Sequence, residues 1–152
     1  MHDKQHVIKE LNKFLRGRYM GVHQYEQLIQ HAQNPLLKEK LQQFQEHAKL
    51  GAQKVAKRIE QLGGTPTDDV GVMGKIQIWL KSIKGYPEQT DEILHDALVG
   101  ENKYGIHLSH EMVAGELDEE STKLIDSLLE EDQKRVDQIR QWIQSHTILE
   151  AR

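Results

Sequence analysis

Apolar residues recur every three or four positions along four long segments of the chain, which is the spacing of one face of an α-helix. The first predicted helix runs from about Lys4 to Gln33. Asn34 and Pro35 follow it, and these residue types commonly cap a helix and occupy its first position. The second helix then extends to Leu62. Because the turn between them is so short, these two helices are predicted to be antiparallel neighbours.

The second half of the chain begins with a long connection instead of a short turn. Residues 63–89 form a long connection that contains one short amphipathic stretch, "GKIQIWLKSIK", and closes at "GYP". Thr90 is predicted to cap a third helix, which ends near Gly115. Asp118 is predicted to cap a fourth helix, which continues to about His146. The chain is therefore expected to be all-α.

Two antiparallel helix pairs joined by one long crossover are the connectivity of ferritin-like four-helix bundles, and we expect that fold with a short extra helix in the connection. The simple up-down-up-down bundle stays open, because the length of the connection permits a crossover without requiring one. In either bundle the periodic residues form four inward-facing seams. These are Leu11, Leu15, Arg18, Val22, Tyr25, Ile29 and Ala32; Leu41, Phe44, Ala48, Gly51, Val55, Ile59 and Leu62; Leu94, Ala97, Glu101, Tyr104, Leu108 and Met112; and Ile125, Leu128, Asp132, Arg135, Val136, Ile139 and Trp142.

Composition supports this interpretation and limits the function. A length of 152 residues suits a single domain, residues 1–152, and 37% hydrophobic with 29% charged residues is typical of a helical bundle. No apolar run approaches the roughly 18 residues of a membrane span, and the N-terminus lacks the apolar core of a signal peptide, so we expect a cytoplasmic protein with no membrane partner. The absence of cysteine excludes disulfides and thiolate ligands. A net charge of -4 gives no general reason to bind nucleic acid.

Charged residues interrupt three of the four seams near the middle of each helix, and small residues interrupt the other. The charged residues are Arg18, Glu101, Asp132 and Arg135. One interpretation is a buried ionic cluster of balanced charge, with Ala48 and Gly51 making room for the arginines. The other is a metal site built on Glu101 and Asp132, because hard cations take oxygen ligands from facing helices.

The stretch "VIKELNKFLRGRYMGVHQYE" resembles the opening helix of bacterioferritins. From the second helix onward, "LGGTP", "DDVGVMG", "WLKSIKG" and "ILHDALVGENKYG" occur in the order and spacing of an uncharacterised bacterial family of ferritin-like four-helix proteins, and the resemblance covers about residues 7–143. It implies a ferritin-like fold. In bacterioferritins a di-iron centre takes one glutamate from the first helix, a Glu-x-x-His pair from the second, one glutamate from the third and a second Glu-x-x-His pair from the fourth. Those ligand positions fall here, in chain order, on Arg18, Ala48, Gly51, Glu101, Asp132 and Arg135.

Only Glu101 matches this ligand set, with Asp132 a conservative replacement. The methionine that ligates haem in bacterioferritins falls on Lys49, so no haem and no other cofactor is expected. We therefore expect a non-enzymatic structural or interaction module without ferroxidase activity. The alternative is an iron- or manganese-binding oxidase or iron-handling protein with rearranged ligands, in which Glu46 and His47 join the two carboxylates.

Histidines offer one further candidate. The chain has 9, and "HLSHE" places His107 and His110 one helical turn apart, with Glu111 four positions after His107. That spacing can hold a transition metal, although surface histidines near carboxylates are common. Since ferritin relatives often assemble, a homodimer or homo-oligomer is the partner that the sequence leaves open.

Overall fold

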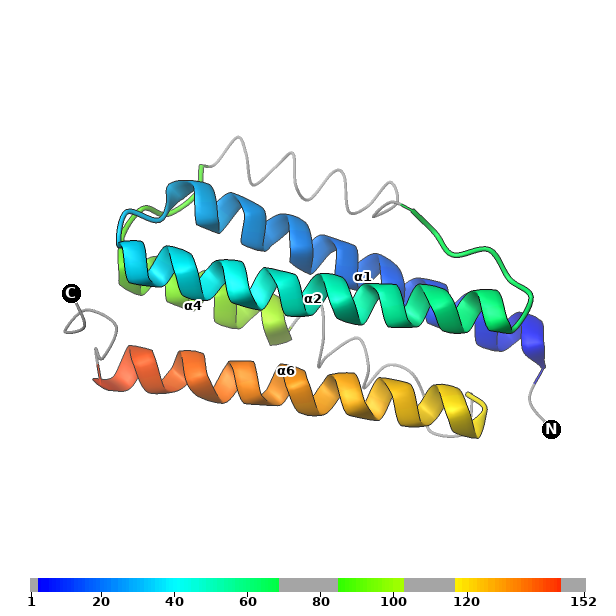
Figure 1. Cartoon of the computed structure of the whole chain (residues 1–152). Coiled ribbons are helices and arrows are strands. Elements are labelled where there is room, and N and C mark those ends of the chain that lie inside the picture. Colours follow the sequence, from blue (N-terminus) through cyan, green and yellow to red (C-terminus); the bar gives the residue numbers. More distant parts are fainter. Residues whose placement is uncertain (1–2, 69–84, 103–116, 146–152) are drawn as a thin grey trace.

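The computed structural model describes residues 3–68, 85–102 and 117–145. These residues form four α-helices with no strand among them: α1 (Lys4–His31), α2 (Pro35–Gln61), α4 (Thr90–Glu101) and α6 (Glu119–Ser145) (Figure 1). The helices lie roughly along a common axis. The predicted all-α four-helix bundle is confirmed.

The turn between α1 and α2 has the predicted cap. The side-chain oxygen of Asn34 accepts hydrogen bonds from the backbone N–H groups of Leu36 at 2.9 Å and Leu37 at 3.2 Å, and Pro35 occupies the first helical position. These bonds satisfy donors that a helix N-terminus leaves without intrahelical partners. The helix before the turn ends at His31, two residues earlier than predicted, because Ala32 adopts an extended backbone.

Contacts at the two ends of the bundle fix the direction of the helices. At one end, the His31 ring stacks on Tyr86, which lies just before α4, with ring centroids 5.4 Å apart. At the other end, Arg58 near the end of α2 donates to Asp118, which lies just before α6, at 2.6 Å. Consequently α2 and α4 begin at the same end and run in the same direction, while α1 and α6 run in the opposite one (Figure 1). The short helix predicted between α2 and α4 lies outside the described residues.

The start of α4 differs from the prediction. Thr90 is the first helical residue, and Gln89 holds the cap position without a side-chain hydrogen bond. Asp91 and Glu92 lie in the first turn, where negative charge suits the helix dipole, so the helix begins without a hydroxyl cap. The predicted continuation of this helix toward Gly115 lies outside the described residues.

The start of α6 agrees with the prediction. Asp118 precedes the helix and its Oδ2 accepts a hydrogen bond from the backbone N–H of Ser121 at 3.3 Å. Its backbone carbonyl accepts from the backbone N–H of Thr122 at 2.9 Å, which closes the first turn. Asp118 therefore has the capping role that its position predicts.

The buried residues form two apolar clusters, one toward each end of the bundle. Among the predicted seam residues that the structure describes, only Val22 and Leu62 are half-buried and the rest are buried. The cluster beside the α1–α2 turn includes Tyr25, Leu28, Leu41, Phe44, Ile93, Leu94, Ile139 and Trp142. The cluster at the opposite end includes Val7, Leu11, Phe14, Leu15, Val55, Ile59, Ile125 and Leu128. Along α1, α2 and α6 the charged or small seam residues lie between these two clusters. On α4, Glu101 follows the residues that belong to the first cluster.

None of the helices that the structure describes is long and apolar enough to cross a membrane. That agrees with the absence of a long apolar run in the sequence.

Candidate functional site

Arg18 reaches from α1 to Asp132 on α6. Its Nη1 donates to Oδ1 at 2.6 Å and its Nη2 donates to Oδ2 at 2.7 Å, so the guanidinium and the carboxylate form two parallel hydrogen bonds. The side chains are 5% and 0% exposed respectively. Paired hydrogen bonds of this kind are among the strongest that charged side chains make, and they fix the relative orientation of both groups.

Arg135 on α6 connects Glu101 to Asp132. Its Nε donates to Glu101 Oε1 on α4 at 2.8 Å, and its Nη2 donates to Asp132 Oδ1 within its own helix. Asp132 thus accepts from both arginines. We call Arg18, Glu101, Asp132 and Arg135 the ionic cluster. Its formal charge is zero, which is the balance that burial of ions requires.

Two aromatic residues complete the surroundings of the ionic cluster. The buried hydroxyl of Tyr25 donates to Glu101 Oε1, the same oxygen that accepts from Arg135. The sequence placed Tyr25 on the inward face of its helix, where a buried hydroxyl needs a hydrogen-bond partner. The Arg18 guanidinium carbon lies 4.6 Å from the centre of the Phe14 ring, within range of a cation–π interaction. Phe14 was missed, although its position four residues before Arg18 puts it on the same helix face.

Small residues on α2 leave space beside the charges. Ala48 faces a cavity of about 20 Å³ that Arg18, Tyr25, Glu101 and Arg135 also line. Arg18 Nε is buried beside it without a hydrogen-bond partner in the described part of the chain. A side chain longer than alanine at position 48 would therefore extend toward the ionic cluster.

Burial and neighbouring charges shift the pKa values of Tyr25, Asp132 and Arg135. Burial raises the pKa of the Tyr25 hydroxyl well above its usual value, and the Glu101 charge raises it further, so Tyr25 remains a hydrogen-bond donor at neutral pH. Burial also raises the pKa of the Asp132 carboxyl, against the opposing effect of Arg18. Burial lowers the pKa of Arg135, but Glu101 and Asp132 raise it by more, so this guanidinium stays charged. Arg135 is therefore a permanent cation at this site.

The other candidate ligands do not join the ionic cluster. Glu46 and His47 are exposed on α2, and Glu46 pairs with Lys49 at 3.5 Å. His107, His110 and Glu111 lie outside the described residues. Over residues 3–68, 85–102 and 117–145, no three or more His, Asp or Glu side chains come together as a metal-binding group.

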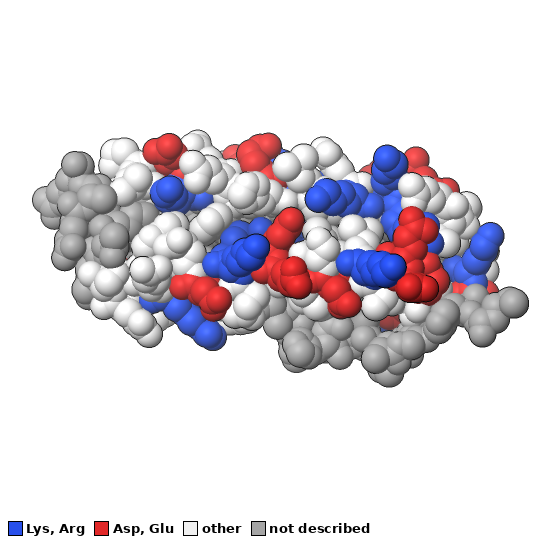
Figure 2. Space-filling model, turned by 60° about the horizontal axis from the view of Figure 1, so that its bottom comes forward, with Lys and Arg blue, Asp and Glu red and all other residues white. Residues whose placement is uncertain are grey.

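The visible surface around α6 carries charges of both signs. Figure 2 brings forward the lower side of Figure 1, where α6 lies, and shows Lys and Arg side chains interspersed with Asp and Glu. Neither sign covers this face continuously.

Residues 6–114 match the family described as "Domain of unknown function (DUF2383)". A search of curated proteins and a search of solved structures each gave no match. The matched region covers most of the 152 residues and includes α1 from residue 6 onward, α2 and α4. The chain therefore belongs to the family described as "Domain of unknown function (DUF2383)".

Proposed function

We infer that this protein is a ferritin-like bundle in which the ionic cluster takes the place of a di-metal centre, and that it acts as a non-enzymatic structural or interaction module. The shared direction of α2 and α4 supports a crossover connection between them, which is the connectivity of ferritin-like bundles. The position of the ionic cluster, midway between two apolar clusters, supports its equivalence to a central metal site.

The observation that carries this proposal is the pairing of both carboxylates with arginines. Asp132 accepts two parallel hydrogen bonds from Arg18 and a third from Arg135. Glu101 accepts from Arg135 and from the Tyr25 hydroxyl on the same oxygen. Carboxylates held in this way would have to release a guanidinium before they bound a metal ion.

Electrostatics also opposes a metal ion among these residues. A dication at about 5 Å from one guanidinium is repelled by roughly 6 kcal/mol at an effective dielectric constant of about 20. Two arginines would share the site, and both are held in the centre of the bundle by hydrogen bonds. The two arginines already neutralise the two carboxylates, so a dication would bring an uncompensated charge of about +2 into the buried centre of the bundle.

One observation favours the alternative of an iron- or manganese-binding protein with rearranged ligands. The structure brings Glu101 and Asp132 onto a single guanidinium, that of Arg135, so two carboxylates from different helices approach one point. A metal-binding form requires the arginines to move and further ligands to approach.

Elemental analysis distinguishes the two proposals. The protein would be purified without chelator from cells supplied with iron and manganese, alongside the Glu101→Gln variant. Glu39→Gln is the surface carboxylate control, because Glu39 is exposed on α2 and neither proposal uses it. We expect metal far below one ion per chain in all three proteins. About two ions per chain, the content of a di-metal centre, retained in Glu39→Gln and lost in Glu101→Gln, would refute the structural role.

Oxidation of Fe(II) supplies an independent test of the absence of enzyme activity. We expect a rate equal to that of buffer alone and no shift of the melting temperature when Fe(II) or Mn(II) is added. A metal-dependent rise in melting temperature with oxidation above the buffer rate would instead establish the metal-handling alternative.

A further inference from the structure

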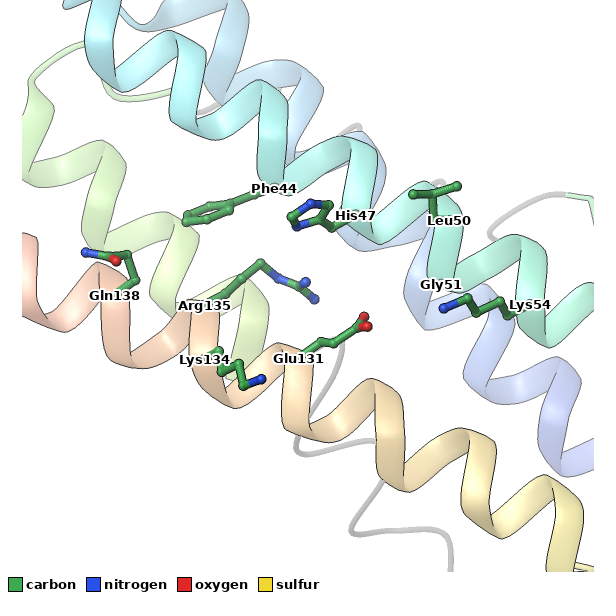
Figure 3. A pocket seen from close by; sticks show the side chains of 9 residues that line it. All are labelled: Phe44, His47, Leu50, Gly51, Lys54, Glu131, Lys134, Arg135 and Gln138. Carbon is green, nitrogen blue, oxygen red and sulfur yellow. The ribbon is translucent and has the colours of Figure 1, made fainter.

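A hollow lies between α2 and α6, and Arg135 lines it. These two helices contact each other much less than α1 and α2 do, and a groove of about 350 Å³ separates their facing side chains. Figure 3 shows side chains from both helices around it. Binding sites for small molecules in proteins have volumes of about 300–1,000 Å³, so the groove is at the small end of that range.

The floor of the groove combines an apolar surface with a charged group. Phe44 and Gly51 contribute from α2, and Arg135 contributes from α6. A Cβ added to Gly51 would come within 3.2 Å of Leu128 Cδ2, so the glycine keeps the two helices close below the groove. The aromatic ring and the guanidinium are thus available from the same opening.

The ionic cluster leaves one edge of Arg135 unused. Its Nε and Nη2 donate to Glu101 and Asp132, whereas Nη1 has no recorded partner among the residues that the structure describes. The guanidinium points into the space between α2 and α6 in Figure 3. The side chain is only 6% exposed, so its orientation is fixed by the carboxylates behind it.

Cationic side chains surround this floor. Lys54 on α2 and Lys134 on α6 line the groove, and neither has a recorded ion pair within the described residues. Glu131 supplies the opposing charge. Since the ionic cluster itself is neutral, two lysines against one glutamate leave one positive charge at the groove.

Apolar surface continues from the floor to the rim. Leu50 lines the groove and is 52% exposed, which is unusual for a large apolar side chain on this protein. Phe44 stacks on Trp142, with ring centroids 5.7 Å apart, and so is held in place from below. A ligand that binds here has a rigid apolar contact next to a cationic one.

We propose that the α2–α6 groove binds a small organic monocarboxylate whose carboxylate meets Arg135 Nη1 and the two lysines, and whose apolar part covers Phe44 and Leu50. The single negative charge of a monocarboxylate matches the single positive charge that Glu131 leaves unbalanced. Arg135 Nη1 and the two lysine ammonium groups are donors that suit the two oxygens of a carboxylate. The groove volume accommodates a short hydrocarbon chain. This inference goes beyond the proposed function and stands without it, because the carboxylates orient Arg135 whatever the role of the bundle.

Titration calorimetry with octanoate tests the proposal on the full chain at neutral pH. We expect saturable binding of one octanoate per chain. Acetate lacks the apolar part and octylammonium has the opposite charge, so each should bind at least about tenfold more weakly. Lys54→Gln and Lys134→Gln should each weaken octanoate binding about three- to fivefold, which is the effect of removing one exposed charge near an ion.

Lys57→Gln is the matched control, because Lys57 is an exposed lysine of α2 outside the groove. It should leave octanoate affinity unchanged within about twofold, and Leu50→Ser should weaken octanoate binding without affecting acetate. Melting curves verify that each variant is folded. Non-saturable octanoate binding, equal affinity for octylammonium, or equal weakening by Lys57→Gln would each overturn the proposal.

Discussion

Replacing Glu101 by glutamine removes one of the two negative charges of the ionic cluster while preserving the shape of the side chain. Arg135 then shares Asp132 with Arg18, and two guanidiniums face a single buried carboxylate. A net positive charge remains in the centre of the bundle. We expect the Glu101→Gln variant to fold with a substantially reduced free energy of unfolding.

The magnitude follows from the geometry. Arg135 Nε lies 2.8 Å from Glu101 Oε1, which places the two charge centres about 4 Å apart and makes their attraction about 4 kcal/mol at an effective dielectric constant of about 20. Glutamine retains an acceptor oxygen and recovers about 1 kcal/mol through a neutral hydrogen bond. The expected loss is about 3 kcal/mol, in keeping with broken buried ion pairs elsewhere. For a chain of this length that corresponds to a fall of about 6–12 °C in melting temperature.

Urea denaturation of four proteins measures the loss of unfolding free energy and tests whether it arises from the Glu101–Arg135 interaction. The wild type, Glu101→Gln, Arg135→Gln and the double variant form a double-mutant cycle. In the double variant the remaining Arg18–Asp132 pair is neutral, so we expect it to lose less stability than the two single variants added together, by about 3 kcal/mol. Lys123→Gln breaks an exposed pair with Glu119 and serves as the surface control, with an unchanged midpoint.

Two results would refute this reasoning. A loss below about 0.5 kcal/mol in Glu101→Gln would show that the charge is solvated rather than buried. Strict additivity in the double variant would show that Glu101 and Arg135 do not interact, whatever each contributes alone.

Two further predictions concern other contacts of the bundle. Gly100→Ala would place a Cβ on Gln24 Oε1, which is the end of a flexible side chain, so Gln24 should rotate away and lose its hydrogen bond to the Asp96 carbonyl oxygen. That loss of about 1 kcal/mol is offset by the better helix propensity of alanine, so the free energy of unfolding should change by less than about 1 kcal/mol in thermal unfolding. A loss above about 3 kcal/mol would contradict this explanation. Partial burial raises the pKa of Asp118, but hydrogen bonds from Ser121 and Arg58 lower it by more, so its folded-state pKa lies below the unfolded value. Its stabilising effect is then present above about pH 4 and lost as the pH falls through the folded-state pKa, so Asp118→Asn should lower the urea midpoint at neutral pH but not below that range. If the urea midpoints of the wild type and Asp118→Asn differed by the same amount at every pH, the stabilising role of the ionised Asp118 carboxylate would be contradicted.

The helices could be predicted because their signals are local. The spacing of apolar residues every three or four positions identified the buried faces, and Asn34 with Pro35 marked the start of α2. The cap of α4 was misassigned to Thr90, because a hydroxyl residue before acidic ones is a common cap signal. In the structure Thr90 is the first helical residue, and Gln89 holds the cap position without a side-chain hydrogen bond. Periodicity therefore fixed the faces of the helices better than their first residues.

The candidate site was only partly accessible from the sequence. Spacing placed Arg18 and Asp132 on inward faces, but their pairing across the bundle depends on how α1 and α6 are arranged in space. The hydrogen bond from Tyr25 to Glu101 likewise depends on how α1 and α4 are arranged in space. The α2–α6 groove was missed altogether, because the separation of two helices is a property of packing and leaves no periodic signal in either one.

Anomalous diffraction tests the central claim most directly. Crystals of the full chain, produced from cells supplied with iron and manganese, would be measured at the absorption edges of both metals. We predict guanidinium density for Arg18 and Arg135 against Glu101 and Asp132, with no anomalous peak between the two carboxylates. An anomalous peak within about 2.2 Å of oxygens from both carboxylates, a normal metal–oxygen distance, would contradict the account.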